Sequence, residues 1–157
     1  MGAVENRLKA MGIVLPVPAA PIANYVPFVI SGAWLVVSGQ LALAENGKID
    51  PSHIGKLGAG VSSEDARAAA RRCAINVLAQ AKVALGDLDR IRRCVRLGGF
   101  INAAPGFSQI APVMNGASDL MVEVLGDCGR HARSTVGVAE LPLDCVTEVE
   151  ALFEISA

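Results

Sequence analysis

Apolar residues recur every three to four positions over residues 63–85, which predicts the longest helix of the chain. Ser62 precedes this segment as an N-cap, and Gly86 follows it as a stop. The apolar positions carry mainly small side chains: Ala66, Ala69, Ala70, Cys73, Ala74, Val77, Leu78, Ala81 and Leu85. Because these side chains are small, we expect the helix to lie close to a sheet.

Two further helices follow from the same periodicity. Residues 4–11 predict a short helix that ends at Gly12. Gly-Gly and Pro-Gly pairs predict a loop over residues 98–108. After this loop, residues 112–125 predict a helix that stops at Gly126.

β-Branched and aromatic residues mark the strands. Residues 25–30 and 34–37 predict a hairpin around Ser31-Gly32. A third short strand is expected near residues 40–43, and residues 91–97 predict a strand that carries several arginines.

The C-terminal segment predicts two more strands, joined at Leu141-Pro142 because proline cannot donate to a strand ladder. Alternation groups three residues on one face of the first strand: Arg133, Thr135 and Gly137. The last strand has an apolar face and an acidic face: Val149, Ala151, Phe153 and Ile155 against Glu148, Glu150 and Glu154. We expect these two strands to pair as a hairpin that brings Arg133 and Glu148 to one pocket.

The order of these elements favours an α+β fold, with one mixed sheet and two helices packed on one face. The chain has 157 residues, enough for one domain with a full hydrophobic core. We therefore expect a single domain over residues 1–157, in which residues 1–20 form the N-terminal helix and a proline-rich extension.

Composition narrows the possible partners. Formal net charge is -1, from 14 basic and 15 acidic residues spread along the chain. This leaves no basic surface for nucleic acid or anionic lipid, so neither is expected as a partner. Hydrophobic residues make up 52% of the chain and charged residues only 18%, which suggests apolar surface buried between subunits.

The run over residues 13–44 carries no charge, so a membrane span has to be considered. Prolines and Ser-Gly pairs interrupt the run at turn spacing, which argues against one smooth apolar helix. Glu5 in the early segment also disfavours a cleaved signal peptide. We expect a cytoplasmic protein.

The four cysteines are scattered: Cys73, Cys94, Cys128 and Cys145. Without a Cys-x-x-Cys pair, and with only His53 and His131 to complement them, they do not predict a metal site. We expect reduced and mostly buried thiols.

Arg133 and Glu148 are the first candidates for chemistry. An isolated arginine on a strand is usually a surface ion-pair partner, but a guanidinium also matches a ligand carboxylate with two parallel N–H bonds. Glu148 has a similar pair of interpretations. It either lies on a solvated strand face or positions and deprotonates a water molecule.

Other candidates are weaker on the sequence alone. Ser38-Gly39 ends an apolar strand, where a missing side chain can expose the backbone to a ligand, but it is also an ordinary turn signal. Tyr25 is either a pocket wall or, more often, a core aromatic residue. His131 has no obvious Ser or Asp partner for a nucleophilic triad. The glycines of residues 55–60 lack phosphate-loop spacing.

Taken in order, these segments resemble the RidA/YjgF family of reactive-intermediate deaminases, which carries the older label endoribonuclease L-PSP. The first likeness is Tyr25 leading into Val-Ser-Gly-Gln at residues 37–40. The more specific one is Ala-Arg-Ser at residues 132–134, then Leu-Pro, then Glu-Val-Glu-Ala at residues 148–151. The resemblance runs from about Pro21 to the C-terminus.

This resemblance implies a chorismate-mutase-like fold, a cytoplasmic homotrimer, and a hydrolase that acts as a deaminase in a cleft between subunits without a cofactor. Its substrates would be 2-imino or 2-enamino acids, which it would convert to 2-keto acids and ammonia. Arg133 would hold the substrate carboxylate and Glu148 would position water. The remaining cleft residues would be Tyr25, Ser38, Gly39, Asn115 and Thr135.

Several departures indicate a divergent branch of the family. Val-Pro-Phe follows Tyr25 where better-known members have Ser-Gln-Ala, and Thr135 stands where many carry cysteine. The stretch over residues 98–115 is longer than usual. Two other functions therefore stay open: a trimeric protein that binds small carboxylates or a protein partner without turnover, and a ribonuclease, which the near-neutral charge disfavours.

Overall fold

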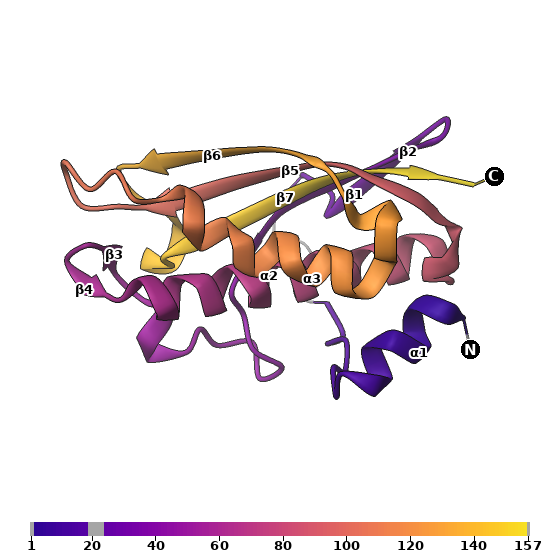
Figure 1. Ribbon diagram of the computed structural model, residues 1–157, viewed down its shortest axis with the longest axis horizontal. Coiled ribbons are helices and arrows are strands. Elements are labelled where there is room, and N and C mark those ends of the chain that lie inside the picture. Colours follow the sequence, from indigo (N-terminus) through magenta and orange to yellow (C-terminus); the bar gives the residue numbers. More distant parts are fainter. Residues whose placement is uncertain (1, 19–23, 157) are drawn as a thin grey trace.

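The computed structural model describes residues 2–18 and 24–156. In these residues, three α-helices lie on one side of a five-stranded sheet, and the first of them packs against the third rather than on the sheet itself (Figure 1). The main elements have the following bounds: α1 Ala3–Ala10, β1 Phe28–Ser31, β2 Trp34–Leu41, β3 Lys56–Leu57, β4 Gly60–Val61, α2 Ser63–Leu85, β5 Ile91–Asn102, α3 Asn115–Leu125, β6 Ala132–Val138 and β7 Thr147–Ile155.

The sheet has the order β1-β2-β7-β5-β6 and is mixed, because β6 pairs with β5 in parallel while the other pairs are antiparallel. The predicted α+β fold with one mixed sheet is therefore confirmed. The predicted hairpin between the strands of Arg133 and Glu148 is wrong, since β5 lies between β6 and β7. A Leu-Pro turn marks a chain reversal, but it does not determine which strand becomes the neighbour.

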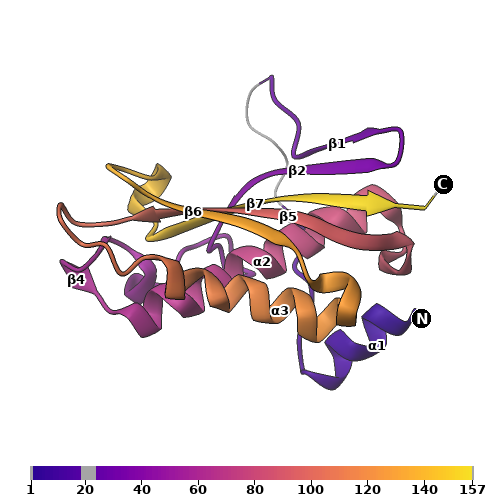
Figure 2. The same cartoon turned by 45° about the horizontal axis from the view of Figure 1, so that its top comes forward.

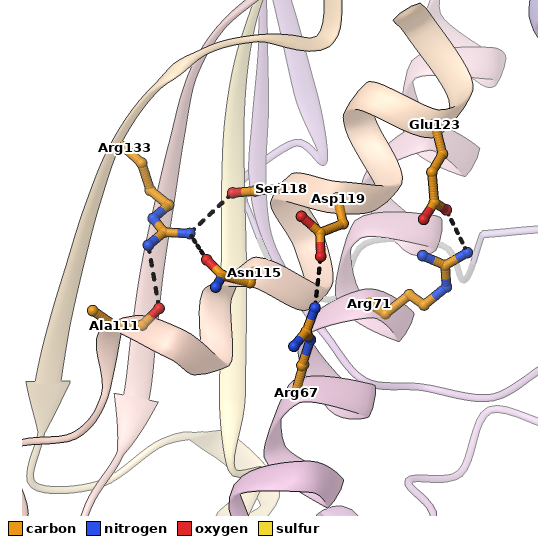
Figure 3. A network of polar contacts seen from close by, with 8 residues as sticks. All are labelled: Arg67, Arg71, Ala111, Asn115, Ser118, Asp119, Glu123 and Arg133. Carbon is orange, nitrogen blue, oxygen red and sulfur yellow. Dashed lines mark hydrogen bonds and ion pairs between the residues drawn. The ribbon is translucent and has the colours of Figure 1, made fainter.

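The longest helix matches its prediction. The Ser62 hydroxyl accepts a hydrogen bond from the Asp65 N–H at 3.0 Å, and Gly86 ends α2 with a φ of 72°. α3 lies very close to α2, because Gly116 packs against the Arg67 backbone with no room for a side chain. Short ion pairs join the outer sides of the two helices: Arg67 to Asp119 at 2.6 Å and Arg71 to Glu123 at 2.8 Å (Figure 3).

Two segments differ from their predictions. The Gly98-Gly99 pair lies inside β5 rather than in a loop, and both glycines are buried. A Cβ on Gly98 would lie 2.6 Å from Glu150, and one on Gly99 would lie 2.7 Å from the Met114 methyl carbon. These glycines therefore allow side chains to approach a central strand. β2 is likewise one strand to Leu41, interrupted by a bulge, rather than two.

α1 is the third helix on the covered side of the sheet. Its first two N–H groups, from Ala3 and Val4, bind the Asp89 carboxylate at 2.7 and 2.8 Å. Val4 and Leu8 are buried in the core. The predicted proline-rich extension reaches into residues 19–23, where the family resemblance also starts, and these positions lie outside the described residues.

Among residues 2–18 and 24–156, no α-helix lies on the other face of the sheet (Figure 2). This face displays apolar side chains that are 45 to 49% exposed: Val29, Trp34, Val36 and Val136. All four cysteines are free, and all but Cys128 are buried, as expected. None of the helices in residues 2–18 and 24–156 has the length and apolar character needed to cross a membrane.

Candidate functional site

Arg133 lies on the edge strand β6 and points to the helix-covered side of the sheet. Its β5 partner, Leu97, is fully buried on that side. Arg133 Nη1 donates to Asn115 Oδ1 at 2.9 Å and to Ser118 Oγ at 3.1 Å. Nη2 donates to the Ala111 carbonyl at 3.2 Å (Figure 3). The guanidinium of this β6 residue is thus held by the first turn of α3 and by Ala111 in the segment just before that helix.

The three partners of Arg133 are all neutral, so they orient its charge without neutralising it. Within the described part of the chain, no carboxylate forms an ion pair with it. The alternative of an ordinary surface ion pair is therefore wrong for these residues. The Nε–H group and one Nη2–H group donate no hydrogen bond to the described residues, and two such donors suit a carboxylate ligand.

A serine and a histidine extend the contacts of Arg133. His131 Nδ1 lies 2.6 Å from the Gly129 carbonyl oxygen, which can only accept, so Nδ1 carries a proton. In the tautomer whose single ring proton is on Nδ1, His131 Nε2 accepts from the Ser118 hydroxyl at 2.9 Å. The same hydroxyl oxygen accepts from Arg133, so its proton points to the histidine and a lone pair points to the guanidinium. The pair can relay a proton or hold Arg133 in place.

Thr135 follows Arg133 on the same face of β6. Its hydroxyl oxygen is buried and has no hydrogen-bond partner among the described residues. A buried hydroxyl without a partner is costly, so Thr135 has a hydrogen-bonding capacity that these residues do not satisfy. Arg133, Asn115 and Thr135, three of the predicted site residues, thus lie in one region.

Ser38, Gly39 and Glu148 form a second group, on β2 and β7. Between Val37 and Gln40, β2 has one residue more than β7, so Ser38 and Gly39 lie in a β-bulge. The Gln40 amide donates to the carbonyls of Ser38 and Gly39 at 2.9 and 3.2 Å. The bulge is thereby held in a fixed shape.

The Glu148 side chain lies directly on Gly39. A Cβ at Gly39 would come within 2.9 Å of Glu148 Cδ and closer still to Oε1. Gly39 has no positive φ, so the close approach of Glu148, and not the backbone conformation, explains why residue 39 is a glycine.

Burial raises the pKa of Glu148, and the nearby charge of Glu150 raises it further. Glu148 is half-buried on the open face of the sheet. A carboxylate with a raised pKa is a stronger base than an exposed one, so it can take a proton from water.

Tyr25 is 60% exposed, so the preference for a core position was wrong. It precedes β1 in a segment that Ser38 holds: the Ser38 hydroxyl donates to the Val26 carbonyl at 2.8 Å, and its N–H donates to Pro27 at 2.9 Å. Tyr25 therefore stands near the second group without being packed into the core.

Within one chain, the group around Arg133 and the group around Glu148 do not form a single site. Val149 and Thr135 are both register partners of Gly99, so they share the helix-covered face with Arg133. Glu148 precedes Val149 on β7 and therefore points to the open face. Arg133 and Glu148 lie on opposite faces of the sheet.

Sequence reasoning missed Ser118 and the role of His131. The two residues are 13 positions apart and come from α3 and from the segment before β6. Ser118 follows Asn115 by three positions on a predicted helix, so the two share a face, and this spacing was the available signal.

Comparison with known proteins gives a family match over nearly the whole chain. A family model described as "YjgF/chorismate mutase-like, putative endoribonuclease" matches residues 5–155. Protein TCP17 of Trypanosoma cruzi is 47% identical over 156 residues, which cover 99% of this chain and 96% of that protein.

Two solved structures show how the chain stands among its relatives. The crystal structure of the protein Atu1372 from Agrobacterium tumefaciens is 48% identical, with a TM-score of 0.89, and covers 98% of this chain and 94% of its own. E. coli TdcF, solved with bound serine, is 26% identical, with a TM-score of 0.62, and covers 89% of this chain and 94% of its own. The chain is much more similar to Atu1372 than to TdcF, as expected for a divergent branch.

Proposed function

Since the chain belongs to the YjgF/chorismate-mutase-like family, we propose that it hydrolyses 2-imino and 2-enamino acids to 2-keto acids and ammonia. The observation that carries the proposal is Arg133, a cation oriented by three neutral oxygens. Its two remaining N–H bonds suit the carboxylate that every such substrate has. TdcF, with its bound serine, is a relative that holds a small carboxylate-bearing molecule.

We place the active cleft between two copies of the chain. Arg133 and Glu148 lie on opposite faces of one sheet, so a cleft that contains both needs Glu148 of the partner subunit. The open face around Glu148 displays the apolar side chains that a second copy would cover. A homotrimer, the assembly implied by the family resemblance, repeats this cleft three times around its axis.

In this cleft Arg133 fixes the substrate carboxylate, and Thr135 and Asn115 face the bound molecule. Glu148 takes a proton from water as the water oxygen bonds to the imine carbon. Glu148 returns this proton to the nitrogen, which gives the neutral carbinolamine. Glu148 then takes the proton of the carbinolamine hydroxyl and passes it to the nitrogen as the C–N bond breaks and the C=O bond forms, so the nitrogen leaves as ammonia and the 2-keto acid remains.

The test generates an imino acid in place with an amino-acid oxidase and follows its loss. We expect wild type to accelerate the loss and Arg133→Ala to lower kcat/KM by about 10²- to 10³-fold, because two charge-assisted hydrogen bonds disappear. Arg67→Ala is the control, since it removes an arginine that is paired with Asp119 instead. Equal rates for wild type, Arg133→Ala and buffer would refute the proposal.

Calorimetry distinguishes catalysis from binding alone. Titration with 2-oxobutyrate should show binding to wild type and a large loss in Arg133→Ala. Binding without any imine hydrolysis would favour the alternative, a non-catalytic trimeric protein for small carboxylates. Absence of binding would reject both functions.

A further inference from the structure

A second cation lies at the other end of β6, far from Arg133. Lys56 of β3 lines an open pocket of about 390 Å³. The rest of the lining is mostly apolar: Ala103, Ala104, Pro105, Phe107, Gly137, Val138 and Ala139, with Glu140 at the edge. Arg133 is five residues before Val138, which corresponds to about 17 Å along a strand. Lys56 and Arg133 therefore belong to two separate sites.

Buried partners hold the Lys56 ammonium in position. It donates to Asn102 Oδ1 at 2.7 Å and to the Ala139 carbonyl. Asn102 is fully buried, and its NH₂ group donates to Asp144 at 2.9 Å and to the Gly55 carbonyl at 3.2 Å. Because both amide hydrogens are used, the amide oxygen must face Lys56. The ammonium is thus aimed into the pocket by fixed groups.

The charge of Lys56 has a weak partner. Asn102 and the Ala139 carbonyl are neutral, so among the described residues Glu140 alone forms an ion pair with Lys56, at 3.4 Å. The Glu140 side chain is 76% exposed, and an exposed pair of this kind contributes little and can open. A carboxylate from outside can therefore take the place of Glu140.

The apolar wall of the pocket is firmly held. Phe107 packs on Gly58, where a Cβ would lie 2.5 Å from the ring, and Gly58 has a φ of 86° that other residues rarely adopt. The Phe107 ring is therefore fixed beside the pocket. A rigid aromatic wall and a single oriented cation suit a ligand with one carboxylate and one apolar group.

We propose that this pocket binds small monocarboxylates with an apolar group, and that the Glu140 carboxylate competes with them for Lys56. The site is independent of the proposed imine hydrolysis at Arg133. Its affinity rises when the internal competitor is removed, a behaviour that a purely structural Lys56–Glu140 ion pair does not produce.

The experiment is calorimetric titration of the full chain with phenylacetate, in an Arg133→Ala background that removes the other carboxylate site. Phenylacetamide is the neutral probe of the same shape. We expect phenylacetate to bind and phenylacetamide to bind at least about tenfold more weakly, since the charged hydrogen bond is lost. Lys56→Met should also weaken phenylacetate by about tenfold or more.

Glu140→Gln is the decisive variant, because it leaves Lys56 and its buried partners untouched. It should tighten phenylacetate binding by about two- to fivefold. Glu123→Gln is the control: it changes net charge equally at another exposed ion pair and should have no effect. Equal affinities for Glu140→Gln and Glu123→Gln, or no binding to either, would overturn the proposal even if Lys56→Met fails to fold.

Discussion

Gly39→Ala tests whether the contact between Gly39 and Glu148 is needed for catalysis. The new Cβ would lie 2.9 Å from Glu148 Cδ and 3.2 Å from Cγ, where ordinary contacts need 3.4 Å or more. The nearest atom is Oε1, so the carboxylate has to move by about 1 Å, a displacement that can cost about 10²-fold in rate. Gly39 has no positive φ, so alanine meets no backbone strain.

The expected result is a fall in activity without a comparable loss of stability. Glu148 is a flexible, half-buried side chain, so its rotation costs about 1 kcal/mol or less. We expect Gly39→Ala to lower kcat for imino-acid hydrolysis by at least about tenfold. The melting temperature should change by only a few degrees, on the order of 4 °C. The oxidase-coupled assay and thermal unfolding measure the two effects.

Gly98→Ala is the matched control on the same face of the sheet. Its Cβ would lie 2.6 Å from Glu150 Oε1, so it moves a neighbouring carboxylate in the same way. We expect kcat to fall less than about twofold, because Glu150 affects the reaction only through the pKa of Glu148. Full activity of Gly39→Ala, or an equal loss in both variants, would refute the reasoning.

Three further predictions concern titration, hydrogen bonding and capping. Because the folded state raises the pKa of Glu148, the charge of Glu148 destabilises the protein above that pKa. Glu148→Gln should therefore raise Tm at pH 7 but give no gain in Tm below about pH 4, where the carboxyl is protonated in both states. The same variant should abolish turnover. Ser118→Ala should weaken 2-oxobutyrate binding by about five- to tenfold in calorimetry, whereas Ser134→Ala, on the open face, should not. Hydrogen bonds from the first N–H groups of α1 lower the pKa of Asp89, so these bonds stabilise the helix at neutral pH and weaken in acid. Asp89→Ala should therefore speed amide hydrogen exchange in α1 by about fivefold.

Local signals in the sequence predicted the elements well. Ser62 and Gly86 set the ends of α2, and the alternation of residues 148–155 assigned the two faces of β7 correctly. These features depend on neighbours along the chain, which periodicity and capping report directly. The strand order depends on which distant strand fills the middle of the sheet, and periodicity holds no information about it.

The same distinction applies to the candidate site. The sequence pointed to Arg133 and Glu148 by residue type and by resemblance, but it placed them on one hairpin. The structure puts β5 between their strands and their side chains on opposite faces. Gly98-Gly99 was equally ambiguous, because glycine serves both turns and close contacts in a strand interior. Only the packing of Glu150 and Met114 distinguishes the two uses.

The placement of Arg133 and Glu148 on opposite faces of the sheet also has a genetic consequence. If each cleft takes Arg133 from one subunit and Glu148 from the next, an inactive Arg133 variant and an inactive Glu148 variant can complement each other. A mixed trimer of Arg133→Ala and Glu148→Gln chains always keeps one cleft with both native residues, so co-expression should restore about a quarter of the clefts. A gene whose protein carried both residues on one face of one chain would show no such intragenic complementation.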